Sequence, residues 1–118
     1  MARDDYPVIV YQILSYLYKQ LKDGKPIQEK YLKADGKLFQ INYTYWVYIL
    51  INLQKDGYIE GLEFTECEYV GESGITSEVE CLESCCITPK GIEYLTDNSF
   101  MKKAKEFLKD VKSIVPFA

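Results

Sequence analysis

The fold of this chain is decided by residues 42–61, whose sequence is NYTYWVYILINLQKDGYIEG. Asn42 is a preferred helix N-cap residue, because its side-chain oxygen can accept a hydrogen bond from an amide of the first turn. Lys55 followed by Gly57 is a typical C-terminal end of a helix. The stretch therefore predicts a helix over about residues 43–56 and a β-strand directly after it. A helix that turns straight into a strand is the central joint of a winged helix.

This helix is apolar on two sides. The stripe that we expect to face the core consists of Trp46, Ile49, Leu50 and Leu53. The apolar residues of the opposite side are Tyr43, Val47, Tyr48 and Ile51. Either other elements of the same chain or a partner must cover this second side.

The length of 118 residues and the 47% of apolar side chains suit one domain with a single core, spanning residues 1–118. The first residues are charged, and no apolar run is long enough to cross a bilayer. We therefore expect no signal peptide, no membrane contact and a cytoplasmic location.

Two helices are predicted before the central stretch. The first begins at a cap at Asp4 or Asp5 and ends near Gly24, and a short one covers about residues 28–33. A connecting segment follows, and we expect it to lie under the long helix, because its large apolar side chains would otherwise be exposed. These side chains are Leu38, Phe39 and Ile41.

Residues 58–87 predict a β-hairpin, the wing, with a loose tip at residues 71–74. The apolar positions change sides between Phe64 and Cys67, and again at residues 82–83. Such changes predict a bulge or a strong twist in each arm.

Two C-terminal helices are predicted after the hairpin. Thr88 caps the first, which ends near Asn98, and Asn98 or Ser99 caps the second. The second carries an apolar stripe of Phe100, Met101, Ala104, Phe107, Leu108 and Val111. This stripe can pack on the first helix of the same chain, or it can form a helical dimer interface. The predicted fold is thus a mostly helical α+β winged helix with a core over residues 4–64 and C-terminal helices over residues 88–115.

Three segments resemble the YjcQ family of small bacterial and phage proteins: GYIEG at 57–61, ITPKGIEYL at 87–95 and NSFMKKAKEFLKDVK at 98–112. This resemblance implies a winged-helix fold with short extra helices and an association with phage or prophage genomes, without a particular biochemical role. The segment TPKG at 88–91 is also similar to the helix that follows the wing in PadR and MarR regulators. That second similarity concerns the fold, and a fold alone does not carry a function.

A winged helix suggests DNA binding through its third helix, but the charges oppose it. The net charge is −4, and no Lys or Arg occurs between Lys55 and Lys90. The hairpin instead carries Glu60, Glu63, Glu66, Glu68, Glu72, Glu78, Glu80 and Glu83, which would repel phosphates. The groups of the helix that could touch bases or sugars are Tyr43, Thr44, Tyr48, Asn52, Gln54 and Lys55. Lys30, Lys33 and Lys37 could form a basic patch with the lysines of the last helix.

The apolar outer side of the third helix, Val47, Tyr48 and Ile51 beside Tyr43, suits a protein partner or self-association better than DNA. The sequence therefore favours a protein-interaction or accessory module. A DNA-binding transcriptional regulator that uses the same helix and the lysine-rich surfaces is the alternative.

An enzyme, a cofactor and a small-molecule substrate are not expected. Histidine is absent, which removes the commonest general base and the commonest zinc ligand. Zinc binding by Cys67, Cys81, Cys85 and Cys86 is disfavoured, because adjacent residues of a strand point to opposite faces. We expect these cysteines to be reduced, with Cys67 and Cys81 as neighbours across the hairpin.

Overall fold

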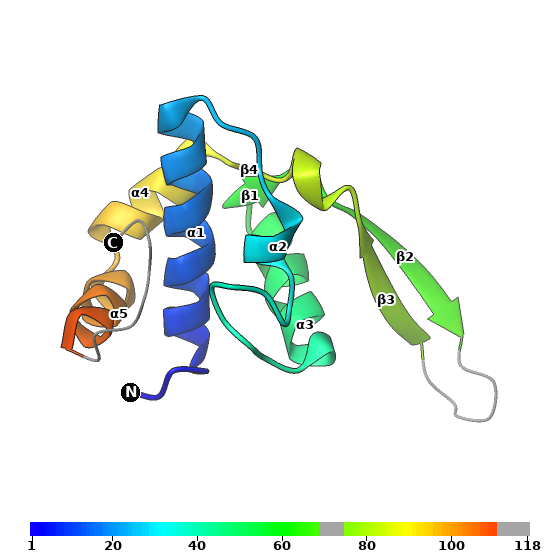
Figure 1. The fold of residues 1–118 in the computed structure, drawn as a ribbon, viewed down its shortest axis with the longest axis horizontal. Coiled ribbons are helices and arrows are strands. Elements are labelled where there is room, and N and C mark those ends of the chain that lie inside the picture. Colours follow the sequence, from blue (N-terminus) through cyan, green and yellow to red (C-terminus); the bar gives the residue numbers. More distant parts are fainter. Residues whose placement is uncertain (69–74, 111–118) are drawn as a thin grey trace.

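The computed structural model describes residues 1–68 and 75–110, with the side chains of 66–68, 75–77 and 110 left undescribed. This part of the chain is a mostly helical α+β fold with five α-helices and two small antiparallel sheets (Figure 1). The elements are α1 (Tyr6–Asp23), α2 (Glu29–Leu32), α3 (Tyr43–Lys55), β1 (Ile59–Glu60), β2 (Glu63–Glu68), β3 (Ile75–Glu80), the 3₁₀ turn η1 (Leu82–Ser84), β4 (Cys86–Ile87), α4 (Pro89–Asp97) and α5 (Ser99–Asp110). None of the described helices combines the length and the apolar character needed to span a membrane.

Helix α3 forms as its local sequence predicts. The side-chain oxygen of Asn42 accepts hydrogen bonds from the amides of Thr44 and Tyr45, at 2.8 and 3.3 Å. The helix ends at Lys55, and Gly57, with a φ of 82°, leads the chain into β1. The predicted joint between the helix and the strand is therefore confirmed.

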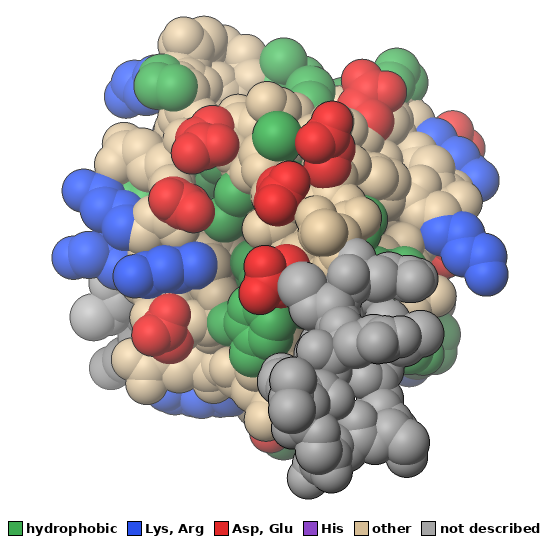
Figure 2. All heavy atoms as spheres, turned by 90° about the vertical axis from the view of Figure 1, so that its right-hand side faces the viewer, with side chains coloured by type: hydrophobic (Ala, Val, Ile, Leu, Met, Phe, Trp, Pro, Cys, Tyr) green, Lys and Arg blue, Asp and Glu red, His purple; other side chains and the backbone are tan. Residues whose placement is uncertain are grey.

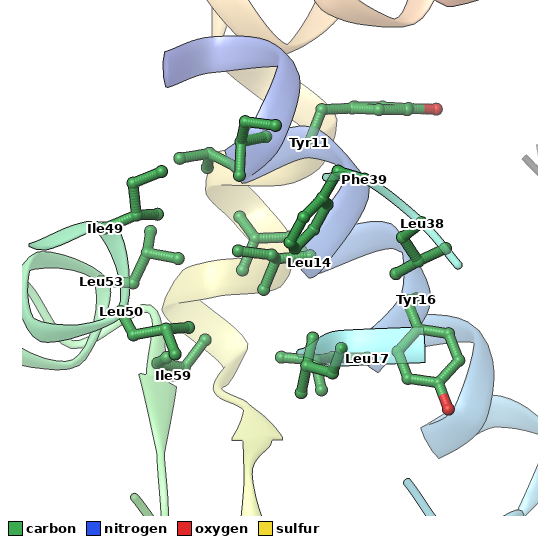
Figure 3. Packing of buried hydrophobic residues seen from close by; sticks show 14 of the residues in the cluster. Tyr11, Leu14, Tyr16, Leu17, Leu38, Phe39, Ile49, Leu50, Leu53 and Ile59 are labelled. Atoms are coloured by element: carbon green, nitrogen blue, oxygen red, sulfur yellow. The ribbon is translucent and has the colours of Figure 1, made fainter. Parts of the chain in front are cut away.

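Helix α1 is the centre of the core. Figure 1 places α4 and α5 on one side of it and α2 and α3 on the other. In Figure 3, side chains of α3 such as Ile49 and Leu53 point toward those of α1, among them Leu14. The helix ends as predicted at Gly24, whose left-handed conformation lets its amide donate to carbonyls of the last turn. Asp5 precedes the first turn, but its side chain makes no capping hydrogen bond there.

The segment between α2 and α3 is buried, as its apolar side chains predict. Leu38 and Phe39 lie in the core, and Ile41 is half-buried. The backbone of this segment is tied to α1, since the Gln12 side-chain amide donates to the Leu38 carbonyl at 2.8 Å. The Trp46 indole of α3 likewise donates to the Leu32 carbonyl of α2 at 3.0 Å. Buried polar groups thus connect the first three helices.

The predicted hairpin over residues 58–87 is present, in two parts. Near the core, β1 pairs with β4, with Ile59 opposite Ile87. Farther out, β2 pairs with β3 from Glu63 opposite Glu80 to the described end of the strands, and this part projects from the helices (Figure 1). The predicted tip at residues 71–74 lies outside the described residues.

Two details of the predicted hairpin need correction. Of the bulge or strong twist predicted between Phe64 and Cys67, the bulge is absent, because each residue there has one partner, and that arm is interrupted instead at Gly61, whose φ is 94°. The reason is close packing, since a side chain at Gly61 would overlap the carbonyl of Ser84 in η1. The register also places Cys67 opposite Thr76, not beside Cys81. At residues 82–83 the arm is interrupted where the sequence predicts an irregularity, but by the 3₁₀ turn η1 instead of a bulge or a twist.

The C-terminal helices begin at the predicted caps. The Thr88 hydroxyl accepts from the amide of Gly91 at 3.0 Å, and the Asn98 side chain accepts from the amides of Phe100 and Met101 at 2.9 and 3.4 Å. Helix α5 packs against α1.

The apolar stripe of α5 is used within the chain. Met101, Ala104 and Leu108 are buried, Phe107 is half-buried and Phe100 remains 54% exposed. Because α1 already covers the centre of the stripe, a second chain has only its edge to bind. Val111, the last residue predicted for a dimer helix, lies outside the described residues.

Candidate interaction surface

Five tyrosines from distant parts of the chain gather beside α3. We call them the tyrosine cluster: Tyr6 at the start of α1, Tyr45 and Tyr48 of α3, Tyr58 before β1 and Tyr94 of α4. The rings of Tyr6 and Tyr48 meet edge to face with their centroids 6.4 Å apart. The rings of Tyr58 and Tyr94 are stacked, with centroids 4.4 Å apart. Tyr48 is the most open of the residues, with 58% of its surface exposed.

Burial raises the pKa of three of these phenols, those of Tyr6, Tyr45 and Tyr94. Burial, helped by the nearby Tyr94 and Asp56, raises the pKa of Tyr6 to about 12. Burial is also the main reason why the pKa of Tyr94 is raised, with Tyr58 and Asp56 adding to it. The hydroxyl of Tyr45, whose pKa burial raises too, donates to the carbonyl of Asp4 at 2.8 Å. These three tyrosines therefore contribute neutral hydroxyl groups to an aromatic surface.

A polar rim borders the cluster at the end of α3. The Lys90 ammonium donates to the Asp56 carbonyl at 2.8 Å and lies 5.3 Å from the centre of the Tyr58 ring. The Asn52 side-chain amide, half-buried, donates back to the Tyr48 carbonyl at 2.8 Å. An aromatic centre with a polar rim is the usual composition of a protein interface.

The outer side of α3 is narrower than its sequence predicts. Val47 is buried and Ile51 is half-buried, so neither forms the exposed apolar surface expected of them. The reason is that α3 also contacts β1 and β3, so the chain itself covers part of its second side. Tyr43 and Tyr48 remain exposed, together with Thr44 and Lys55.

Gln54 serves the fold and is not free to read bases. Its side-chain amide donates to the Leu62 carbonyl and its oxygen accepts from the Leu62 amide, each at 2.9 Å. This pair of hydrogen bonds holds the chain between β1 and β2 against α3.

The described part of the hairpin is acidic. Figure 2, which looks at the molecule from the side on which the hairpin projects, shows Asp and Glu side chains gathered on this face and Lys and Arg at its margins. The exposed carboxylates of the hairpin here are Glu60, Glu63, Glu78, Glu80 and Glu83, whereas the side chains of Glu66, Glu68 and Glu72 lie outside the described residues. Glu63 and Glu80 even stand opposite each other in the register, which is an unfavourable pairing of like charges. A nucleic-acid backbone would be repelled from this face.

The comparison with known families decides the relationship of the chain. A family model described as YjcQ protein matches residues 11–114, nearly all of the described fold and the three segments that carry the resemblance. This chain belongs to the YjcQ family. A search of curated proteins gave no match, and a search of solved structures gave none.

The lysines that the sequence suggested as one basic patch lie in two separate places in this YjcQ-family chain. Lys30, Lys33 and Lys37 are exposed on α2 and the segment after it. The lysines of α5 lie on the other side of α1 (Figure 1). The single basic patch expected from the sequence is therefore wrong, because the central helix divides it.

The described cysteines differ in their surroundings. Cys85 is buried, which raises the pKa of its thiol to about 12. Its neighbour Cys86 is half-buried, and Cys81 is exposed, with its thiol 3.8 Å from a carboxylate oxygen of Glu63. Among the residues that the structure describes, no three Cys, Asp or Glu side chains are grouped as metal ligands.

Alkaline pH is expected to destabilise the fold through Tyr6. An unfolded tyrosine loses its proton above its ordinary pKa of 10.0, whereas the folded Tyr6 keeps it up to about 12. In this window the unfolded state binds fewer protons, so the free energy of unfolding falls as the pH rises. Urea unfolding at several pH values between about 9 and 12 measures the effect. Tyr6→Phe should reduce the slope without removing it, because burial also raises the pKa of the Cys85 thiol to about 12. An equal slope in both proteins would contradict a contribution from Tyr6.

Proposed function

We propose that this YjcQ-family chain is a non-enzymatic winged-helix module that binds a protein partner through the tyrosine cluster. The order of the elements supports the winged-helix part of the proposal: three helices, a hairpin that begins where α3 ends, and two further helices. In this interpretation α3 is the third helix. Its Tyr45 and Tyr48 meet the N-terminal end of the chain and the start of α1, and Tyr58, after α3, stacks on Tyr94 of α4.

The observation that carries the proposal is the exposed ring of Tyr48 held against Tyr6. Tyrosine is among the residues that dominate binding energy in protein interfaces, because it brings a large amphipathic surface with few rotatable bonds. The surrounding rings are fixed by stacking and by the hydrogen bond of Tyr45 to Asp4. A partner would therefore meet a surface that needs little ordering on binding.

Recognition of DNA through α3 has less support. Of the polar groups that the sequence offers for it, Asn52 and Gln54 make hydrogen bonds within the chain. Helix α3 contains no Arg, and Lys55 is its single lysine. The acidic hairpin follows directly after it, so a duplex along α3 would approach like charges.

The proposal is tested with a photo-crosslinking amino acid at position 48, using position 30 as the exposed control. We expect a covalent adduct with one defined protein from position 48 alone, and its mass separates a second copy of the chain from a different protein. Equal labelling at both positions, or none at position 48, would refute the proposal.

Replacing Tyr48 by alanine should weaken the complex with the purified partner by about 2 kcal/mol, as expected for an aromatic residue at the centre of an interface. Tyr43→Ala is the matched control, because Tyr43 is an exposed tyrosine of the same helix whose ring packs on Trp46, 5.5 Å away. Titration calorimetry measures both variants. Equal losses of binding free energy for the two variants would mean that the tyrosine cluster is not the binding surface.

A further inference from the structure

A hollow of about 660 Å³ lies between α1, α4 and α5. Its polar lining consists mainly of four lysines, Lys19, Lys22, Lys102 and Lys105, and two hydroxyl residues, Ser15 and Thr96. We call this the lysine groove. It lies on the far side of α1 from the projecting hairpin (Figure 1).

The lysine groove is strongly cationic for a protein of net charge −4. Among the described residues, the one acidic residue of the lining is Asp23, which is paired with Lys19 at 3.2 Å, so the other three lysines have no carboxylate partner in the described lining. Lys22 is positioned by its contact with the Tyr18 ring, whose centre lies 4.4 Å from the ammonium. The hairpin carboxylates are separated from the groove by the helical core (Figure 1). Dissolved salt screens the repulsion between exposed charges beyond about 10 Å. The hairpin carboxylates should therefore repel an anion in the groove only weakly.

The floor of the groove is mostly buried. Met101 and Tyr11 line it, but they are 1% and 8% exposed, so their apolar surfaces are already used in the core. Leu95 and Tyr18 are half-buried and add some apolar surface to the lining. Its polar groups are mainly ammonium and hydroxyl groups. These are the side-chain groups that contact phosphate and sugar in nucleic-acid complexes, whereas protein interfaces depend on aromatic residues and Arg.

We propose that the lysine groove binds the phosphodiester backbone of nucleic acid without sequence preference. Lysine acts as a point charge and lacks the planar fork with which Arg reads guanine, so these residues recognise phosphate and not bases. This site is independent of the tyrosine cluster. The family member would thus carry a protein-binding face and a nucleic-acid-binding face that are built from different residues of one small domain.

The test is the anisotropy of a labelled DNA duplex of mixed sequence, titrated with the full chain at several salt concentrations. If all four lysines contact phosphates, the logarithm of the binding constant should fall against the logarithm of the salt concentration with a slope of about −3.6. Lys102→Glu with Lys105→Glu should lower the affinity at least about tenfold. Both side chains are exposed, so the fold should be retained, and circular dichroism checks this.

The matched control is Lys30→Glu with Lys33→Glu, which changes the net charge equally at exposed lysines outside the groove. We expect it, and Tyr48→Ala, to leave the affinity nearly unchanged. Equal losses of DNA affinity for the two lysine pairs would overturn the proposal, because they would show that DNA responds to the overall charge of the protein and not to the groove. No binding at low salt would overturn it as well. Competition by polyglutamate as strong as by unlabelled DNA would overturn it in favour of an acidic polypeptide.

Discussion

Replacing Gly91 by alanine is expected to lower the free energy of unfolding by about 3 kcal/mol or more, the upper range for overpacking a core. Gly91 is buried in the first turn of α4, and a side-chain carbon there would overlap the carbonyl oxygen of Tyr58 and lie 2.9 Å from a side-chain carbon of Ile87. The Tyr58 carbonyl cannot rotate away, because it accepts a hydrogen bond from the amide of Thr88 at 3.1 Å. The new methyl group would therefore separate α4 from the β1–β4 pair. Urea unfolding followed by the fluorescence of the buried Trp46 measures the loss.

Gly24→Ala is the control for this prediction. Gly24 has a φ of 65°, and no atom lies within 4 Å of the added carbon, so this substitution tests backbone strain without a clash. It should cost about 1–2 kcal/mol, the penalty for a left-handed residue that has a side chain. A smaller loss at Gly91 than at Gly24 would mean that α4 is not in close contact with the strand.

The sequence predicts best the features that depend on contacts between residues only a few positions apart in the chain. The caps at Asn42, Thr88 and Asn98 each join a side chain to an amide two or three positions ahead, so the local sequence is sufficient to place the helix starts. The positions of α3 and of the hairpin follow from the same kind of signal. The family match then agrees with the resemblance carried by three short segments.

The surfaces depend on how distant elements pack, and the sequence alone does not show this. Tyr6 and Tyr48 are far apart in the chain, and nothing in either segment indicates that their rings meet. The burial of Val47 has the same origin, because the extent to which other elements cover α3 is a tertiary property. The lysine groove joins lysines of α1 to lysines of α5, whereas charge counting along the chain suggested a patch that α1 in fact divides.

Met101→Ala should lower the free energy of unfolding by about 3 kcal/mol, within the range measured for truncating a buried methionine to alanine. Met101 is 1% exposed, in the stripe of α5 that packs on α1, and its truncation would leave a cavity. The effect on helix propensity is small, since alanine and methionine both favour helices. Phe100→Ala is the matched neighbour, and it should cost less than about 1 kcal/mol because this ring is 54% exposed.

The protein concentration separates the two uses that the α5 stripe could have. If Met101 is buried within one chain, the midpoint of thermal unfolding should be the same at every protein concentration. The loss of stability caused by Met101→Ala should not depend on the concentration either. If the stripe were instead exchanged with a second chain, the midpoint would rise with concentration, because association would then contribute to stability. Differential scanning calorimetry of the parent protein and the two variants over a hundredfold range of concentration, about 1 to 100 μM, covers the regime in which such coupling is measurable. A concentration-dependent midpoint, removed by Met101→Ala but kept in Phe100→Ala, would contradict intrachain docking of α5 and would make the stripe an interface between two chains.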